Sequence, residues 1–157
     1  MPPSLMPKSS VRVQAEAFSV EAEIAALTEG RTDIGAVVTF SGLCRDEAGT
    51  LAALEIEHYP GMAEAEIARV VAEAEARWPL AGVRVIHRHG RMAPSAQIVL
   101  VVTASRHRAA AFEAASFLMD YLKASAPFWK KEHRVDGNAG DWVAAKASDD
   151  EAAARWD

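Results

Sequence analysis

Basic residues that could bind an anion are concentrated in the second half of the chain. The segment from Arg106 to Arg134 contains six Lys or Arg residues and only three acidic residues, although the whole chain carries a formal net charge of −5. A local excess of positive charge within an acidic protein favours a site for an anionic ligand over general nucleic-acid binding. The basic residues of this segment are therefore the first candidates for chemistry.

The first basic group follows Ser105, which we expect to be the N-cap of a long helix that ends near Ser125. The group consists of Arg106, His107 and Arg108. These residues would occupy the first helical turn, where free backbone N–H groups and the positive end of the helix dipole disfavour cations. Their presence is explained if an anion such as a phosphate binds among them. The alternative is a solvated basic turn after a strand.

The second basic group consists of three lysines, Lys123, Lys130 and Lys131. Lys123 falls in the last turn of the expected helix, where a lysine often serves only as a partner for the helix dipole. Lys130 and Lys131 follow Phe128 and Trp129, which can anchor the backbone. Lysines at a pocket can stabilise developing negative charge or transfer protons. The alternative is an exposed strand that happens to be basic.

Other kinds of site are disfavoured by the sequence. Cys44 is the only cysteine, so no intrachain disulfide can form, and this suits a reducing, cytoplasmic compartment. His58, His87 and His89 lack metal-ligand spacing, so we expect them to pack or form hydrogen bonds, with no metal and no cofactor bound. P-loop, GxGxxG and GxSxG motifs are missing. The apolar runs are shorter than the roughly 20 residues that span a bilayer, so we expect no membrane segment.

The elements that must position these residues alternate between strands and helices. Because strands come in pairs between helices, we expect an α+β domain with a mainly antiparallel sheet covered by two long helices. Residues 1–10 are expected to form a flexible N-terminus and residues 11–157 a single domain. The expected strands are 11–18, 34–41, 51–59, 83–89 and 97–104, with a turn at 90–96 and a hairpin of 129–135 and 142–146. The expected helices are 19–30, 62–78 and 105–125, with a last helical turn at 148–151.

Several motifs in this order and spacing resemble those of a known family. They are GAVVTFSGLCR at 35–45, LEIEHYPGM at 54–62, SRHR at 105–108, MDYLKASAPFWKKE at 119–132 and WV at 142–143. Together they cover nearly the whole chain from about residue 11, and they resemble the large, catalytic subunits of molybdopterin synthase, the MoaE family.

The resemblance implies an α/β-hammerhead-like fold and a sulfurtransferase activity. Such an enzyme converts cyclic pyranopterin monophosphate to molybdopterin by building a dithiolene. The sulfur comes from the thiocarboxylated Gly-Gly C-terminus of a small ubiquitin-like subunit. A homodimer of large subunits would form the centre of a heterotetramer. The alternative is a non-catalytic binding module that docks a ubiquitin-like tail.

The resemblance also implies roles for individual residues. It makes Lys123 and Lys130 the catalytic lysines, and both would also contact substrate. It further implies that Cys44 is a bystander, since the partner delivers the sulfur. The remaining substrate-binding residues implied by the resemblance are Leu43, Cys44, Arg45, His107, Arg108, Lys131 and Glu132.

Overall fold

A computed structural model of the chain describes residues 8–125, 127–143 and 147–157. Most of the expected flexible N-terminus, residues 1–7, lies outside the described residues. The strands are β1 (Ser10–Gln14), β2 (Ala36–Leu43), β3 (Leu51–His58), β4 (Leu80–Arg88), β5 (Gly90–Met92), β6 (Gln97–Ser105), β7 (Phe128–Arg134) and β8 (Ala139–Trp142). The helices are α1 (Val20–Thr28), α2 (Met62–Arg77), α3 (Arg108–Ser125) and α4 (Ala147–Ala154).

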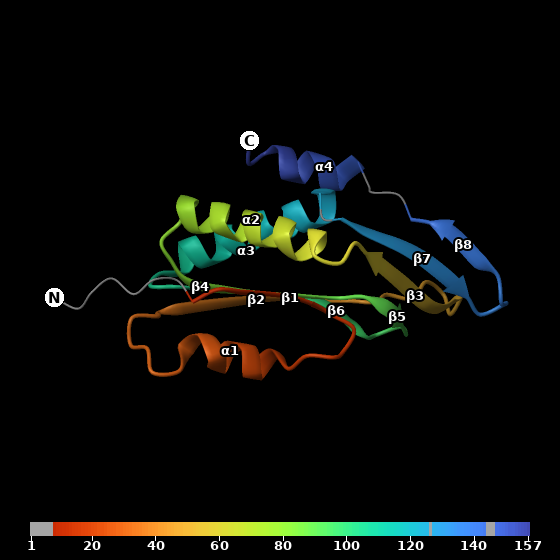
Figure 1. Cartoon of the computed structure of the whole chain (residues 1–157), viewed down its shortest axis with the longest axis horizontal. Coiled ribbons are helices and arrows are strands. Elements are labelled where there is room, and N and C mark those ends of the chain that lie inside the picture. The colour runs from red at the N-terminus through yellow and green to blue at the C-terminus, as the bar shows by residue number, and fades with distance from the viewer. Residues whose placement is uncertain (1–7, 126, 144–146) are drawn as a thin grey trace.

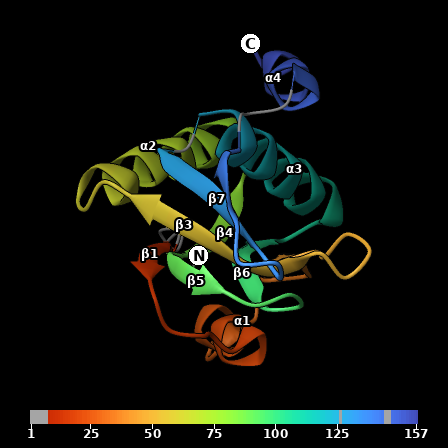
Figure 2. The same cartoon turned by 90° about the vertical axis from the view of Figure 1, so that its right-hand side faces the viewer.

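The strands form two four-stranded sheets, where the sequence suggested one. The first sheet has the order β1-β4-β6-β2 and the second the order β5-β3-β7-β8 (Figures 1 and 2). Among the strands of the described residues, only β1 and β4 pair in parallel, and the other pairs are antiparallel. The α+β class with mainly antiparallel pairing and two long helices is therefore confirmed.

The chain passes from the first sheet to the second within the segment that the sequence predicts to be a turn. Gly90 has a φ of 98°, a conformation that glycine adopts without steric cost. Directly after β4, this residue begins the short strand β5, which pairs with Leu54 to Ile56 of β3. A three-residue strand is too short for hydrophobic periodicity to reveal it.

Helices cover both faces of the first sheet. Figure 1 shows α2 and α3 on one face, α1 on the other, and α4 outside α3. Val101 of β6 packs in the cluster under α2 and α3, whereas Leu100 and Val102 pack in the cluster on the α1 side. Strand β6 is therefore buried on both faces, as expected for a central strand.

Helix α1 begins as the sequence predicts and is joined to the sheet by an ion-pair group. The Ser19 hydroxyl accepts a hydrogen bond from the Ala22 N–H at 3.1 Å, which is a side-chain N-cap. Glu23 is buried, and its carboxylate forms ion pairs with Arg12 of β1 and with Arg84 of β4, the latter at 2.6 Å. This group ties the helix to two neighbouring strands.

Helix α3 begins later than the sequence predicts. Ser105 is the last residue of β6 and is paired with Ala36 on one side and Leu80 on the other, so it is held in an extended conformation. Its hydroxyl donates a hydrogen bond to the Pro79 carbonyl at 2.8 Å. Ser105 is therefore not the N-cap. Arg106 and His107 precede the helix, contrary to their predicted place in its first turn, and helix α3 begins at Arg108.

The C-terminal part of the chain contains the expected hairpin with different bounds. Its strands are β7 and β8, and β8 ends at Trp142, while residues 144–146 of the expected strand lie outside the described residues. The expected last turn is the two-turn helix α4. No helix within the described ranges is long and apolar enough to cross a membrane.

Candidate functional site

A cavity of about 770 Å³ lies where β2, α3 and β7 approach one another. Its lining includes Arg45, Lys123, Lys130 and Arg134 as cations, with Glu47, Glu132 and Asp149 as acids. Leu43, Cys44, Met119, Leu122 and Phe128 provide an apolar part of the wall, and His87 lies among them. The pocket therefore combines positive charge with apolar surface, as a ring-containing anion requires.

The alternation of β7 determines which of its side chains face the pocket. Phe128, Lys130, Glu132 and Arg134 all line it, because residues two apart lie on the same face of a strand. Lys131 lies on the opposite face, where its ammonium group is 5.5 Å from the centre of the Trp142 ring. Within this chain Lys131 does not line the pocket, contrary to the sequence-based prediction.

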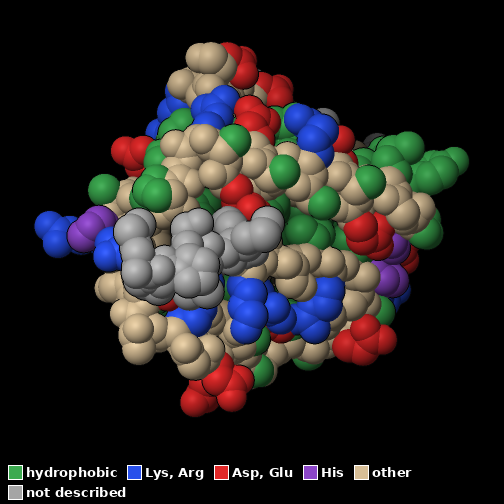
Figure 3. All heavy atoms as spheres, turned by 60° about the vertical axis from the view of Figure 1, so that its left-hand side comes forward, with side chains coloured by type: hydrophobic (Ala, Val, Ile, Leu, Met, Phe, Trp, Pro, Cys, Tyr) green, Lys and Arg blue, Asp and Glu red, His purple; other side chains and the backbone are tan. Residues whose placement is uncertain are grey.

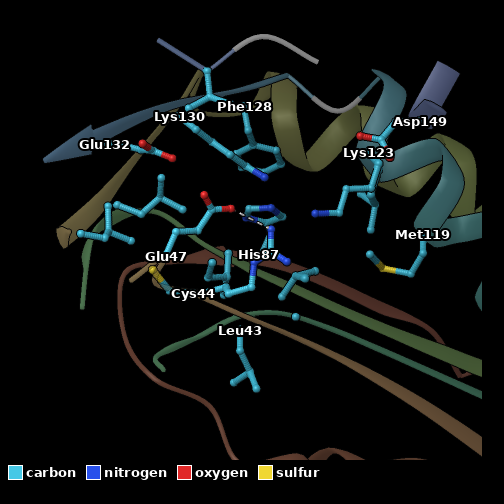
Figure 4. A pocket seen from close by; sticks show the side chains of 18 of the residues that line it. Leu43, Cys44, Glu47, His87, Met119, Lys123, Phe128, Lys130, Glu132 and Asp149 are labelled. Carbon is cyan, nitrogen blue, oxygen red and sulfur yellow. Dashed lines mark hydrogen bonds and ion pairs between the residues drawn. The ribbon is translucent and has the colours of Figure 1, made fainter. Parts of the chain in front are cut away.

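The last turns of α3 supply the opposite wall. Met119, Leu122 and Lys123 are spaced three and four residues apart and therefore lie on one side of the helix. Figure 4 shows Lys123 reaching in from α3 and Lys130 reaching in from β7, on opposite sides of the pocket. The structure thus brings together the two lysines that the resemblance makes catalytic.

The end of β2 forms part of the pocket floor, and its shape depends on a glycine. The pairing of β2 with β6 shifts between Gly42 and Leu43, which is a β-bulge. A Cβ atom on Gly42 would lie 2.6 Å from Cγ1 of Val99, so glycine allows the close approach of the two strands. After the bulge, the exposed Arg45 guanidinium forms an ion pair with Glu47 at 3.3 Å.

Cys44 is buried and is among the residues that line the pocket. It packs with Ile56, Met92 and Ile98, and its backbone is held by hydrogen bonds to Ser95 and Ala96. Burial raises the pKa of the Cys44 thiol, so the nucleophilic thiolate is disfavoured. That Cys44 is a bystander in catalysis remains a prediction.

His87 is a pocket residue that sequence reasoning did not select. Its ring stacks on Phe128 with centroids 3.8 Å apart and planes 12° from parallel. Burial, together with the charges of Lys130, Lys123 and His58, lowers the pKa of His87 to about 4, although a hydrogen bond to the Arg88 carbonyl opposes the shift. The imidazole is therefore neutral near pH 7.

The basic group at the start of α3 lies far from the pocket within one chain. Arg108 and Lys123 are separated by fifteen residues of helix, which corresponds to about 22 Å at 1.5 Å per residue. His107 and Arg108 are exposed and are not among the pocket-lining residues. The two predicted groups of basic residues are therefore two separate places on the chain.

Charge outside the pocket is mixed in sign. The face seen in Figure 3 carries an adjoining group of Lys and Arg side chains together with several groups of acidic side chains. That face does not offer the continuous positive surface that a nucleic acid requires. Among the residues that the structure describes, no group of three or more His, Cys, Asp or Glu side chains could hold a metal ion.

The fold and the pocket define an α+β protein with lysines placed to act on an anionic, partly apolar ligand. A model of the MoaE protein family matches residues 13–125, which is well over half of the chain. The chain belongs to this family, which confirms the resemblance of its motifs.

Individual relatives agree with this assignment. The chain is 69% identical over 147 residues to a molybdopterin synthase catalytic subunit from Mesorhizobium japonicum, covering 94% of this chain and 92% of the relative. Its structure is similar to that of a molybdopterin biosynthesis MoaE protein from Burkholderia ambifaria, with a TM-score of 0.81, 46% identity and coverage of 95% and 98%. A molybdopterin synthase structure from Staphylococcus aureus has a TM-score of 0.76 and 30% identity, with coverage of 84% and 95%.

Proposed function

We propose that this chain is the catalytic subunit of a molybdopterin synthase and acts in the cytoplasm. It would convert cyclic pyranopterin monophosphate to molybdopterin with sulfur from a thiocarboxylated small subunit. The observation that carries the proposal is the pocket in which Lys123 and Lys130 converge from two different elements. The name of the relative from Mesorhizobium japonicum supports both the activity and the existence of a partner subunit. The single cysteine of the chain suits the reducing cytoplasm.

The pocket chemistry suits the proposed reaction. Sulfur transfer opens a cyclic phosphate, expels oxygen groups and releases the carboxylate of the partner's tail, so negative charge develops at several oxygen atoms. Lys123 and Lys130 can stabilise this charge and supply protons to the leaving oxygens. Arg45 is exposed at the edge of the pocket, where it can exchange its ion pair with Glu47 for a contact with the substrate phosphate. Leu43 and Glu132 would contact the substrate from the same lining.

His107 and Arg108 can take part in this reaction only if they come from a second copy of the chain. Within one chain Arg108 lies about 22 Å along α3 from Lys123, and His107 directly precedes the helix, so neither side chain can reach that lysine. A two-fold dimer can place the start of α3 of one copy at the pocket of the other. The symmetry then repeats the same contact at the second pocket, with the roles of the two copies exchanged. The proposed homodimer would thus give both residues their predicted role in phosphate binding.

A reconstituted assay tests the proposed function. The purified chain is mixed with cyclic pyranopterin monophosphate and a thiocarboxylated small subunit, and the dithiolene product is measured after its oxidation to a fluorescent pterin. A small subunit with an ordinary C-terminal carboxylate is the control. Product in the first mixture only is the expected result. If the chain binds the tail but never yields product, it is a docking module and the proposal is wrong.

A further inference from the structure

His87 is a buried side chain in the pocket wall to which the proposed mechanism gives no role. It lies near the end of β4 and is only 6% exposed, yet it is among the residues that line the pocket. In Figure 4 the His87 ring is seen next to the ends of Lys123 and Lys130. Burying a polar ring near cationic side chains is unfavourable unless its nitrogens find hydrogen-bond partners, so an apolar side chain would be a simpler way to fill this space.

The backbone fixes the tautomer of this histidine. Nδ1 of His87 lies 2.8 Å from the Arg88 carbonyl oxygen, which can only accept a hydrogen bond. Nδ1 therefore carries the proton, and Nε2 of the neutral ring carries a lone pair. With Nδ1 engaged by the backbone, Nε2 is the ring nitrogen left to meet a ligand.

The direction of this lone pair is also fixed. The face of the imidazole stacks on Phe128, nearly parallel at 3.8 Å, and this contact opposes rotation of the ring. A serine hydroxyl or a glutamine amide could present either a donor or an acceptor to a ligand. His87 presents an acceptor only. It differs from the other acceptors in the lining, Glu47, Glu132 and Asp149, because it is uncharged and does not neutralise the lysines beside it.

We propose that His87 determines substrate specificity by accepting, at Nε2, a hydrogen bond from a ring N–H group of the pterin. This inference rests on the proposed function, which supplies a substrate with both N–H donors and a phosphate. The charged and the uncharged groups of the lining would contact different parts of the ligand. Lys123, Lys130 and Arg45 attract the phosphate and other anionic oxygens of any ligand, whereas the neutral acceptor responds only to a ligand that also carries a donor in the right place.

Three substitutions at His87 separate the acceptor from the packing of the ring. His87→Phe keeps a flat ring against Phe128 and removes both nitrogens. His87→Gln can place an amide oxygen near the position of Nε2, and the shorter His87→Asn cannot. His58→Phe is the matched control. The ring centroids of His58 and Phe128 are 6.2 Å apart, but His58 is not among the pocket-lining residues.

The test measures binding by calorimetry without the small subunit, using cyclic pyranopterin monophosphate and, separately, inorganic phosphate. We expect His87→Phe and His87→Asn to weaken binding of the pterin by about three- to tenfold, the effect of losing one hydrogen bond. His87→Gln should recover most of this loss, and His58→Phe should match wild type. Affinity for inorganic phosphate should be unchanged in all four variants.

The outcomes distinguish this inference from the proposed function. Equal pterin affinity in wild type, His87→Phe and His87→Asn would overturn the role of His87 alone. Parallel loss of pterin and phosphate binding would also overturn it, because His87 would then only support the shape of the pocket. If His87→Phe does not fold, the comparison of His87→Gln with His87→Asn decides in the same way. A wild-type chain that binds no pterin would overturn the proposed function as well.

Discussion

Lys130 and Lys131 are adjacent in sequence, and their side chains lie on opposite faces of β7. Replacing each by alanine therefore compares the loss of a pocket lysine with the loss of a lysine outside the pocket. Lys130 lines the pocket together with Phe128 and Glu132. Lys131 lies over the exposed ring of Trp142. The two substitutions remove the same charge from adjacent positions, so they have the same effect on net charge and nearly the same effect on strand propensity.

The expected magnitudes differ because the surroundings differ. Removing a donor that stabilises charge in the transition state costs about 10²- to 10³-fold in kcat, so we expect that loss for Lys130→Ala. Lys131→Ala should leave turnover within about twofold of wild type, as is usual for surface changes away from a site. Its measurable effect should be a loss of about 0.5–1 kcal/mol in the free energy of unfolding, from the cation–π contact with Trp142.

Single-turnover formation of the dithiolene product with saturating thiocarboxylated partner gives the two rates directly. Urea denaturation of both variants provides the stability control. Comparable losses of activity in the two variants would refute the assignment of faces, since the side chains of Lys130 and Lys131 would then both have to act in the pocket. Near-normal turnover of Lys130→Ala would remove this lysine from the catalytic mechanism.

Co-expression of Lys123→Ala and Arg108→Ala chains should restore activity that neither variant has alone. About half of the dimers in a random mixture are mixed and each mixed dimer has one intact pocket, so about a quarter of all pockets should be intact. No recovery in mixed dimers isolated with two affinity tags would show that Arg108 does not act across the dimer. Cys44→Ser should keep most turnover while losing about 1–2 kcal/mol of stability from burial of a hydroxyl; lost turnover with intact partner binding would make the thiol a participant. Glu23→Gln should lower the free energy of unfolding by about 1–3 kcal/mol, because its two arginine partners lose a charged hydrogen-bond acceptor; an unchanged urea midpoint would contradict this.

Much of the fold could be predicted because long periodic segments and caps leave clear patterns. Helix α2 and the central strand β6 were found from their hydrophobic patterns, and α1 from Ser19 and the acids that follow it. The sequence does not predict the second sheet, because that sheet depends on the short strand β5 and on pairing between distant segments. The sequence predicts a cap at Ser105, and this is wrong because strand pairing on both sides of the residue outweighs its preference for a helix start.

The candidate site was only partly predictable for similar reasons. The motifs selected Lys123, Lys130 and Arg45, which the structure brings to one pocket. The alternation of β7 was available in the sequence, and it would have placed Lys131 on the other face and added Arg134 to the lining. Whether the start of α3 meets a pocket depends on a second chain, and no pattern within one sequence reports such a contact.

His87 shows a different kind of limit. From the sequence, a histidine in an apolar strand is most simply a packing residue, and the structure confirms that it is buried against Phe128. Its position in the pocket and its fixed tautomer follow from the pairing of β4 with β6 and from the turn of the backbone at Arg88. These are three-dimensional facts that composition and spacing do not encode.

The distribution of the pocket along the chain has a consequence for its synthesis. The lining begins at Gly42 and includes Asp149, close to the C-terminus. During synthesis the chain emerges from the ribosome N-terminus first, at about 5–20 residues per second. Contacts between segments that are distant in sequence form late in folding. A nascent chain therefore has no complete pocket until almost all of it has emerged. Truncated products that end before Asp149 lack part of the pocket lining, so only a chain of nearly full length can present all of the side chains on which the proposed reaction depends.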